Sequence, residues 1–326
     1  MFHQGTEVPS LVFNQGPAQA TITEVGRALI VIAGPTGAGK TSLALDLAGK
    51  LRGEIVNCDS LQLYRGFDVG TAKTPVAERR NIPHHLFDVL EPADGYSAGD
   101  YARLAREAIG EISDRNRLPL VVGGAGFYLR ALLEGLPELP SRDPATRTRL
   151  QARERHRPGS LHHLLTRLEP AAARDVHPRD VQKVIRALEI RLLTGAARRP
   201  DPLRPDPLEG FRILKIGLNP ERRELFARLD ARVQAMFSGG LIEEVRALLE
   251  RGATGDEKPF ESLGYRQAVE YIRGEMTLEQ AILSTQAGTR QYAKRQWTWF
   301  RGDPEMRWLA GFGDDPEVVQ RALELV

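Results

Sequence analysis

The segment Gly34-Pro35-Thr36-Gly37-Ala38-Gly39-Lys40-Thr41 constrains this chain more than any other, because it matches the pattern G-x-x-x-x-G-K-[ST]. A continuously apolar run, Leu29–Ala33, precedes it, and residues 41–48 follow with helical periodicity. A strand, a glycine-rich turn and a helix in this order predict a phosphate-binding loop (P-loop) whose backbone N–H groups face an anion. Lys40 supplies a point charge there, and the Thr41 hydroxyl is placed to hold Mg²⁺.

Three further apolar runs indicate buried strands, at Glu54–Cys58, Leu118–Val122 and Phe211–Leu218, and a helix is predicted over about residues 98–113. Strands that alternate with helices predict an α/β fold with a doubly wound, mostly parallel sheet. In such a sheet, ligands bind beyond the carboxyl ends of the strands.

The alternation stops near Pro140, after which Arg-rich helical stretches replace strands. The segment Pro200–Pro207 carries too many prolines for a helix or a central strand, so it reads as a linker. We therefore expect an N-terminal extension (1–27), a P-loop core domain with C-terminal helices (28–140 plus 206–326), and a helical insertion domain (141–205).

Charge is unevenly distributed, although the formal net charge is only +2. Residues 142–212 hold sixteen Lys and Arg against nine Asp and Glu, and residues 280–301 hold four basic side chains and no acid. Such windows attract polyanions, but equally charged helical faces are often merely solvated.

The single cysteine, Cys58, excludes an internal disulfide and a zinc site with several Cys ligands. No basic head with an apolar run marks a secretory signal, and no apolar run approaches the ~20 residues that a membrane helix needs. We expect a cytoplasmic protein without membrane contact.

Asp59 directly follows the predicted strand Glu54–Cys58. An acid at the carboxyl end of a strand near the P-loop suits a general base that faces an acceptor nucleophile, although Asp-Ser is also a common turn pair. Leu118–Val122 ends in two glycines, where many P-loop NTPases carry an acid that organises Mg²⁺. These residues leave the reaction open, since a nucleoside or small-molecule kinase uses the same loop and base.

Six segments in the same order resemble one family closely, the bacterial tRNA dimethylallyltransferases, also called tRNA isopentenyltransferases. They are GPTGAGKTSLALDLA (34–48), NCDSLQLYRGFDVGTAK (57–73), VVGGAGFYLRALLEGL (121–136), DVQKVIRALEIRLLTG (180–195), LGYRQA (263–268) and TRQYAKRQWTWFR (289–301).

The resemblance implies transfer of a dimethylallyl group from dimethylallyl diphosphate to N6 of the adenosine 3′ of the anticodon, with Mg²⁺ as cofactor. Gly34 to Thr41 would hold the diphosphate, with Asp59 as general base and Lys40 as a second catalytic residue. The partner would be the tRNA anticodon stem-loop, bound by a monomer. The resemblance assigns tRNA contact to Asp59, Ser60, Leu61, Gln62, Ala125, Arg147, Gln182, Lys183, Val184, Ile185, Arg186, Glu261, Ser262, Leu263, Gly264, Tyr265, Arg266, Lys294, Arg295, Gln296, Trp297, Thr298, Trp299, Phe300 and Arg301.

One position departs from the family pattern. The family motif G-G-T-G reads Gly123-Gly124-Ala125-Gly126 here, so a hydroxyl is missing. We expect a water or Thr71 to replace it. A non-catalytic RNA-binding protein is the alternative that Ala125 suggests.

If residues 290–301 are helical, Arg290, Lys294, Trp297 and Arg301 share one face, where cations and an aromatic ring can meet RNA. We also expect at least one of Trp297 and Trp299 in the core.

Overall fold

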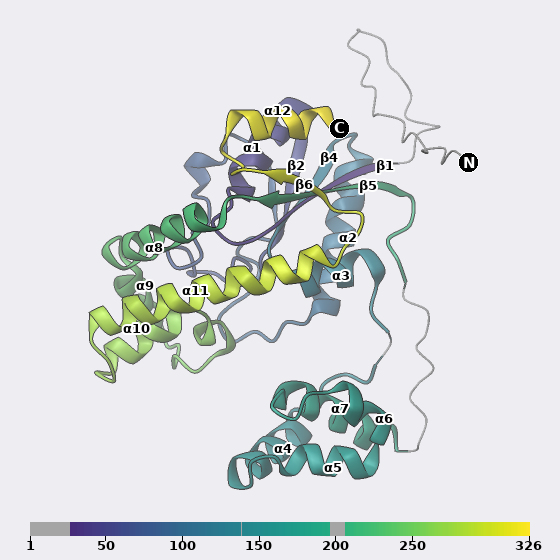
Figure 1. The fold of residues 1–326 in the computed structure, drawn as a ribbon, viewed down its shortest axis with the longest axis vertical. Helices are drawn as coiled ribbons and strands as arrows, with labels where there is room; N and C mark the ends of the chain where they lie inside the picture. The colour runs from purple at the N-terminus through teal and green to yellow at the C-terminus, as the bar shows by residue number, and fades with distance from the viewer. Residues whose placement is uncertain (1–26, 138, 196–205) are drawn as a thin grey trace. The chain divides into compact units, whose positions relative to one another are not determined.

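The computed structural model describes residues 27–137, 139–195 and 206–326 (Figure 1). The predicted N-terminal extension, apart from Arg27, and most of the predicted proline-rich linker lie outside these residues. In the part of the chain that is described, none of the helices combines the length and the apolar character needed to traverse a bilayer.

The core is one sheet whose six described strands all run parallel, in the order β3-β2-β4-β1-β5-β6 (Figure 1). This confirms the predicted α/β fold. The two shortest strands, β3 and β6, were not predicted. The strands are β1 (Arg27–Ala33), β2 (Gly53–Cys58), β3 (His84–His85), β4 (Leu118–Gly123), β5 (Phe211–Asn219) and β6 (Arg307–Ala310).

Helices cover both faces of the sheet. Successive strand residues point to opposite faces, so alternate residues of one strand pack against different helices. Ile30 and Ile32 of β1 belong to a core cluster with α1 (Lys40–Leu51) and α12 (Pro316–Glu324). Leu29 and Val31 belong to a second cluster with α2 (Ala98–Asp114) and α3 (Gly126–Glu134). Burial on both faces explains why the central strands read as continuous apolar runs.

After β5 the chain continues through α8 (Arg222–Ser238), α9 (Leu241–Glu250), α10 (Tyr265–Ile272) and α11 (Leu278–Arg301). These helices share a third core cluster with the segment that follows β2. In this cluster the Phe67 ring lies 5.0 Å from Phe260 and 4.7 Å from Tyr265, measured between ring centroids. The helices thereby position the residues that follow Asp59. Short 3₁₀ turns lie at Val76–Glu78 and Lys258–Glu261.

The chain divides into two compact units. One comprises the described residues within Met1–Leu133 and Leu208–Val326, and the other those within Glu134–Pro207. The second unit holds α4 (Pro144–His156), α5 (Ser160–Leu168), α6 (Pro170–Asp175) and α7 (Val181–Thr194). It has its own apolar core, which includes Leu161, Leu165, Ile185 and Leu188.

Candidate active site

The phosphate loop joins β1 to α1 through conformations that require glycine. Gly34, Gly37 and Gly39 have φ angles of 134°, 78° and 86°. An ideal Cβ on Gly34 would lie 2.9 Å from Leu218 O, and one on Gly39 would lie 2.7 Å from Gly313 N. Because the first turn of α1 has no intrahelical acceptors for its N–H groups, the loop presents amide donors and the positive end of the helix dipole.

Lys40 begins α1 and folds back into the loop. Its Nζ donates to Gly34 O at 3.1 Å and to Pro35 O at 2.8 Å. Desolvation lowers the pKa of Lys40 to about 8, against an opposing effect from the Asp59 carboxylate. The ammonium group is therefore held inside the loop by carbonyl oxygens, where it can meet an anion.

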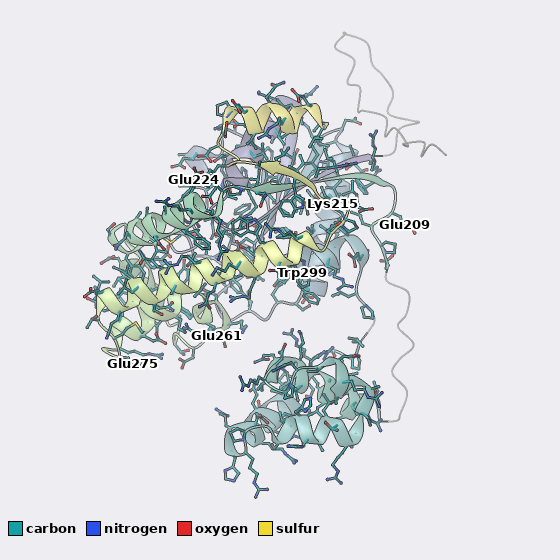
Figure 2. All side chains as sticks on the ribbon, viewed as in Figure 1. Glu209, Lys215, Glu224, Glu261, Glu275 and Trp299 are labelled. Atoms are coloured by element: carbon teal, nitrogen blue, oxygen red, sulfur yellow. The ribbon has the colours of Figure 1, made fainter. Side chains whose placement is uncertain are left out.

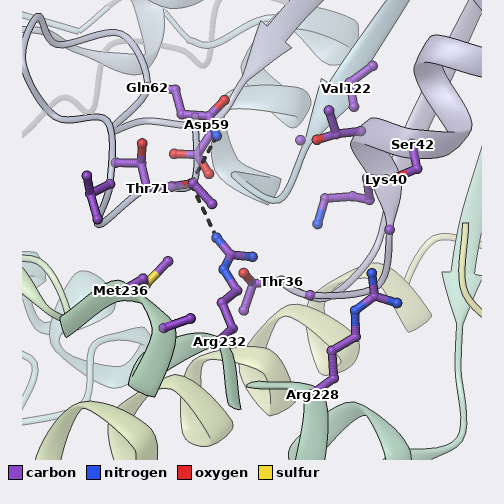
Figure 3. Close-up of a pocket in the computed structure, with 17 residues that line it drawn as sticks. Thr36, Lys40, Ser42, Asp59, Gln62, Thr71, Val122, Arg228, Arg232 and Met236 are labelled. Atoms are coloured by element: carbon purple, nitrogen blue, oxygen red, sulfur yellow. Dashed lines mark hydrogen bonds between the residues drawn. The ribbon is translucent and has the colours of Figure 1, made fainter. Parts of the chain in front are cut away.

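The loop faces a cavity of about 550 Å³. Its walls come from the phosphate loop, the end of β2, residues 62–72, the end of β4 and α8 (Figure 3). Lys40, at the start of α1, and Asp59, in the turn after β2, both point into this cavity (Figure 3). The predicted catalytic pair is thus brought together at the carboxyl edge of the sheet.

Asp59 is oriented by its neighbours. Its Oδ1 accepts from Leu61 N at 2.9 Å, and its own N–H donates to Asn57 Oδ1 at 2.9 Å. Asn57 is buried, and its Nδ2 donates to Leu86 O at 2.9 Å. Asp59 therefore makes the turn that the sequence allowed as an alternative, and it also lines the cavity.

Two arginines of α8, Arg228 and Arg232, line the cavity and were missed by the sequence analysis. Arg232 points from α8 toward Thr71 and Asp59, and donates to Thr71 O at 3.3 Å (Figure 3). Desolvation lowers the pKa of Arg232 while Asp59 raises it, and a guanidinium group remains charged in proteins.

Arg228, one helical turn earlier, pairs with Asp314 at 2.9 Å. The sequence signal was a basic i, i+4 pair on a helix, which is indistinguishable from a solvated face.

The segment that carries Thr71 is held by α9 and α10. Glu244 Oε2 accepts from Asp68 N at 3.0 Å and from Val69 N at 2.7 Å. Glu244 Oε1 accepts from the hydroxyl of Tyr265 at 2.6 Å. Tyr265 is fully buried, and its hydroxyl helps to hold this segment in place through Glu244.

Thr71 lines the cavity, but its hydroxyl donates to Phe67 O at 2.7 Å. We expected the Thr71 hydroxyl to replace the hydroxyl that is missing at Ala125. In the structure the Thr71 hydroxyl instead donates its proton to a carbonyl oxygen of its own loop. Ala125 binds the end of β2 through its backbone, since its N–H donates to Cys58 O at 3.2 Å. Cys58 is buried, which raises its thiol pKa to about 12.

In the second unit, two of the residues assigned to tRNA contact, Arg147 and Arg186, pair with the buried carboxylate of Glu189. Glu189 accepts from Arg147 at 3.1 Å and from Arg186 at 2.7 Å. Arg147 also donates to Gln182 Oε1 at 3.2 Å. Gln182 and Lys183 are exposed, whereas Val184 and Ile185 lie in the core of this unit.

In the first unit, the assigned residues are partly exposed and partly buried. Glu261, Arg266, Lys294, Arg295, Thr298, Trp299 and Arg301 are exposed, Ser60, Leu61, Gln62, Ser262 and Leu263 are half-buried, and Gly264, Tyr265, Gln296, Trp297 and Phe300 are buried.

The two tryptophans of α11 differ in exposure. Trp297 is buried against Leu225 and Leu229 of α8, which confirms that at least one belongs to the core. Trp299 is 46% exposed on the surface of α11 (Figure 2). Arg290 pairs with Asp230 of α8. The face with Arg290 and Trp297, which we expected to meet RNA, therefore packs on α8.

Comparison with known proteins identifies the family. A family model described as IPP transferase matches residues 62–303. The tRNA dimethylallyltransferase of Solibacter usitatus is 55% identical over 304 residues, which cover 91% of this chain and 97% of that protein.

Among solved structures, the tRNA isopentenylpyrophosphate transferase of Bacillus halodurans is 36% identical, with a TM-score of 0.67 over 91% of this chain and 94% of that chain. A eukaryotic dimethylallyltransferase acting on tRNA is 27% identical, with a TM-score of 0.70 over 91% and 78% of the two chains. On the fold, the site and these matches, the chain belongs to the tRNA dimethylallyltransferase family.

Proposed function

We propose that this protein transfers the dimethylallyl group of dimethylallyl diphosphate to N6 of the adenosine 3′ of the tRNA anticodon. The observation that carries the proposal is that Lys40, Arg232 and Asp59 line the same cavity. Cations and loop amides suit a diphosphate at one side of this cavity, and a carboxylate suits the acceptor amine at the other.

The diphosphate binds in the phosphate loop and leaves from it. Loop amides, Lys40 and Arg232 stabilise the negative charge that develops as the C–O bond of the allylic carbon breaks. Arg228 lies one turn earlier on α8, and it is more exposed and already paired with Asp314, so it contributes less.

The donor set fits Mg²⁺ as the family implies. The Thr41 and Ser42 hydroxyls and the Asp59 carboxylate line the cavity, and we propose that Thr41 holds the ion. Within the described residues no group of three or more His, Cys, Asp or Glu forms a cage, and Mg²⁺ commonly binds through one or two protein ligands with phosphate oxygens and water. When bound, the ion would neutralise charge on the leaving diphosphate.

Asp59 receives the proton of the amine. As the new N6–C bond forms, the C–O bond breaks, the diphosphate leaves with the electron pair, and one N6 proton passes to the carboxylate. The hydrogen bond from Leu61 N holds that carboxylate in place, so the amine can be aligned with the allylic carbon. The target base reaches the cavity only after it leaves its stack.

Exposed basic and aromatic residues provide the RNA contacts in this proposal. Lys294, Arg295, Trp299 and Arg301 are all exposed on α11, and such a combination of cations and an aromatic ring binds phosphates and stacks on bases. In the second unit, Gln182 and Lys183 are exposed and supply further polar and basic groups for RNA. We propose that this unit is the insertion domain and that it binds tRNA.

The decisive experiment is mass analysis of nucleosides from tRNA incubated with enzyme, Mg²⁺ and dimethylallyl diphosphate. We expect a dimethylallyl adduct on adenosine at the position 3′ of the anticodon. A parallel incubation with ATP labelled in the γ-phosphate tests the kinase alternative. Label on any acceptor, with unmodified tRNA, would overturn the proposal.

The variant Asp59→Asn tests the assigned base. Asparagine keeps the acceptor for Leu61 N but accepts no proton at neutral pH, so we expect the single-turnover rate to fall about 100-fold or more. The dissociation constant of tRNA should change less than about twofold. An unchanged rate in this variant contradicts the role of Asp59.

A further inference from the structure

Gln296 of α11 is buried between two loops that meet at the cavity. Its Oε1 accepts from Thr36 N at 2.8 Å, and its Nε2 donates to Gly124 O at 2.9 Å. Gln296 is only 6% exposed to solvent. An amide offers an acceptor and a donor at once, so one side chain satisfies backbone groups of two separate segments.

We propose that Gln296 is a positioning residue, which fixes the start of the phosphate loop against the turn 123–126 so that the loop is shaped for a diphosphate. The inference rests on the proposed function, because it takes the diphosphate to be the ligand of the loop. It differs from the tRNA contact that the family resemblance assigned to Gln296.

The bond to Thr36 decides which amides of the loop face the ligand. Thr36 N points to α11, while Ala38 N donates to Pro35 O at 3.3 Å. The donors left for a phosphate are those of Gly37, Gly39 and the first turn of α1. Gln296 thus sets the point at which the loop begins to curl around its ligand.

The turn after β4 is shaped to receive the same side chain. An ideal Cβ on Gly124 would lie 2.1 Å from Gln296 Nε2, and one on Gly126 would lie 2.2 Å from the Trp299 ring. An ideal Cβ on Gly123 would lie 1.9 Å from Cys58 O. Glycines at these positions allow α11, the turn and the end of β2 to approach closely.

The surroundings of Gln296 connect it to the acceptor side of the cavity. Tyr292 lies one turn earlier on α11, and burial followed by the charge of Asp59 raises the pKa of its phenol. Gln296 therefore lies among the phosphate loop, the turn 123–126 and the neighbourhood of the proposed base. A change there should alter the loop without touching the exposed residues of α11.

The test compares Gln296→Met with Gln291→Met. Methionine keeps the length of glutamine but leaves Thr36 N and Gly124 O without partners. Gln291 lies on the same helix with its side chain exposed, so it is a matched control. The dissociation constants of Mg²⁺-pyrophosphate and of an anticodon stem-loop are measured separately by calorimetry for both variants and for the unmodified chain.

We expect Gln296→Met to weaken pyrophosphate binding about tenfold, because two buried backbone groups lose their hydrogen bonds. The stem-loop constant should stay within about twofold, and Gln291→Met should leave both unchanged. Equal pyrophosphate affinity in Gln296→Met and the unmodified chain overturns the inference, as does weakened stem-loop binding alone. If the unmodified chain itself binds no pyrophosphate, it is the proposed function that fails.

Hydrogen exchange of the unmodified protein gives a second test that does not depend on a folded variant. The Thr36 amide should already be protected without ligand, and pyrophosphate should leave its protection unchanged. The amides of Gly37 and Gly39 should gain protection on binding. A Thr36 amide that exchanges freely until pyrophosphate is added would contradict the inference.

Discussion

The surroundings of Lys40 lower the pKa of its side chain, and this bears directly on ligand binding. Burial removes water from its ammonium group, which lowers its pKa to about 8, and two loop carbonyl oxygens accept hydrogen bonds from that group. The charged form is the one that attracts a diphosphate. Above that pKa, binding requires the lysine to take up a proton first, so affinity must fall as the pH rises.

We therefore predict that binding of dimethylallyl diphosphate weakens by up to about tenfold per pH unit above a pH of about 8. The measurement is a calorimetric titration series from about pH 7 to about pH 10. The variant Lys40→Arg is the control, because arginine keeps its charge over this range and its curve should be flat. A constant affinity of the unmodified chain would contradict the assigned pKa.

Site residues whose positions follow from a short stretch of sequence could be predicted. The phosphate loop needs only a strand, three glycines and a helix in succession, and Asp59 needs only its place after β2. Gln296 illustrates what was not predictable from the chain alone. Its partners Thr36 and Gly124 are 260 and 172 residues away, and nothing in a helical pattern reveals which loop a buried amide will meet.

At the scale of elements, α8 does more than cover the sheet. One face buries Leu225, Leu229 and Val233, and the neighbouring face turns Arg228 and Arg232 toward the cavity. Amphipathic periodicity predicts such a helix but not its position in the fold. The side of the cavity formed by α8 therefore became visible only in three dimensions.

The two arginines of α8 should differ in their effect on the ligand. We predict that Arg232→Met weakens pyrophosphate binding at least tenfold, because the guanidinium group is desolvated and aimed into the cavity. Arg228→Met should cost less than about threefold, since Arg228 is 41% exposed and already paired with Asp314. Calorimetry of both variants decides the matter, and equal losses would mean that α8 acts only through its net charge.

At the scale of the whole molecule, the chain separates into two units with separate cores. In the second unit Glu189 is completely buried, and it accepts from Arg147, Arg186 and the Asp143 N–H. Loss of this carboxylate charge leaves two guanidinium groups without their counter-ion. The break in strand pattern after Pro140 indicated helices here, but it could not indicate that a buried acid organises them.

We predict that Glu189→Gln weakens anticodon stem-loop binding about tenfold or more, while pyrophosphate affinity stays within about twofold. The reason is that the phosphate loop and its supports all belong to the first unit. Both constants are measured by calorimetry on the full chain. A parallel loss of pyrophosphate binding would contradict the independence of the two units.

The back of the phosphate loop is closed by residues from the far end of the chain. Gly313 N donates to Ala38 O at 2.8 Å, and Gly39 has no room for a Cβ beside Gly313. A polypeptide emerges from the ribosome in order, so Lys40 appears on the order of tens of seconds before Gly313 does. Throughout that interval the nascent chain carries the phosphate motif without the turn that supports it. We therefore expect the loop to acquire the supported shape described above only after Gly313 has been synthesised.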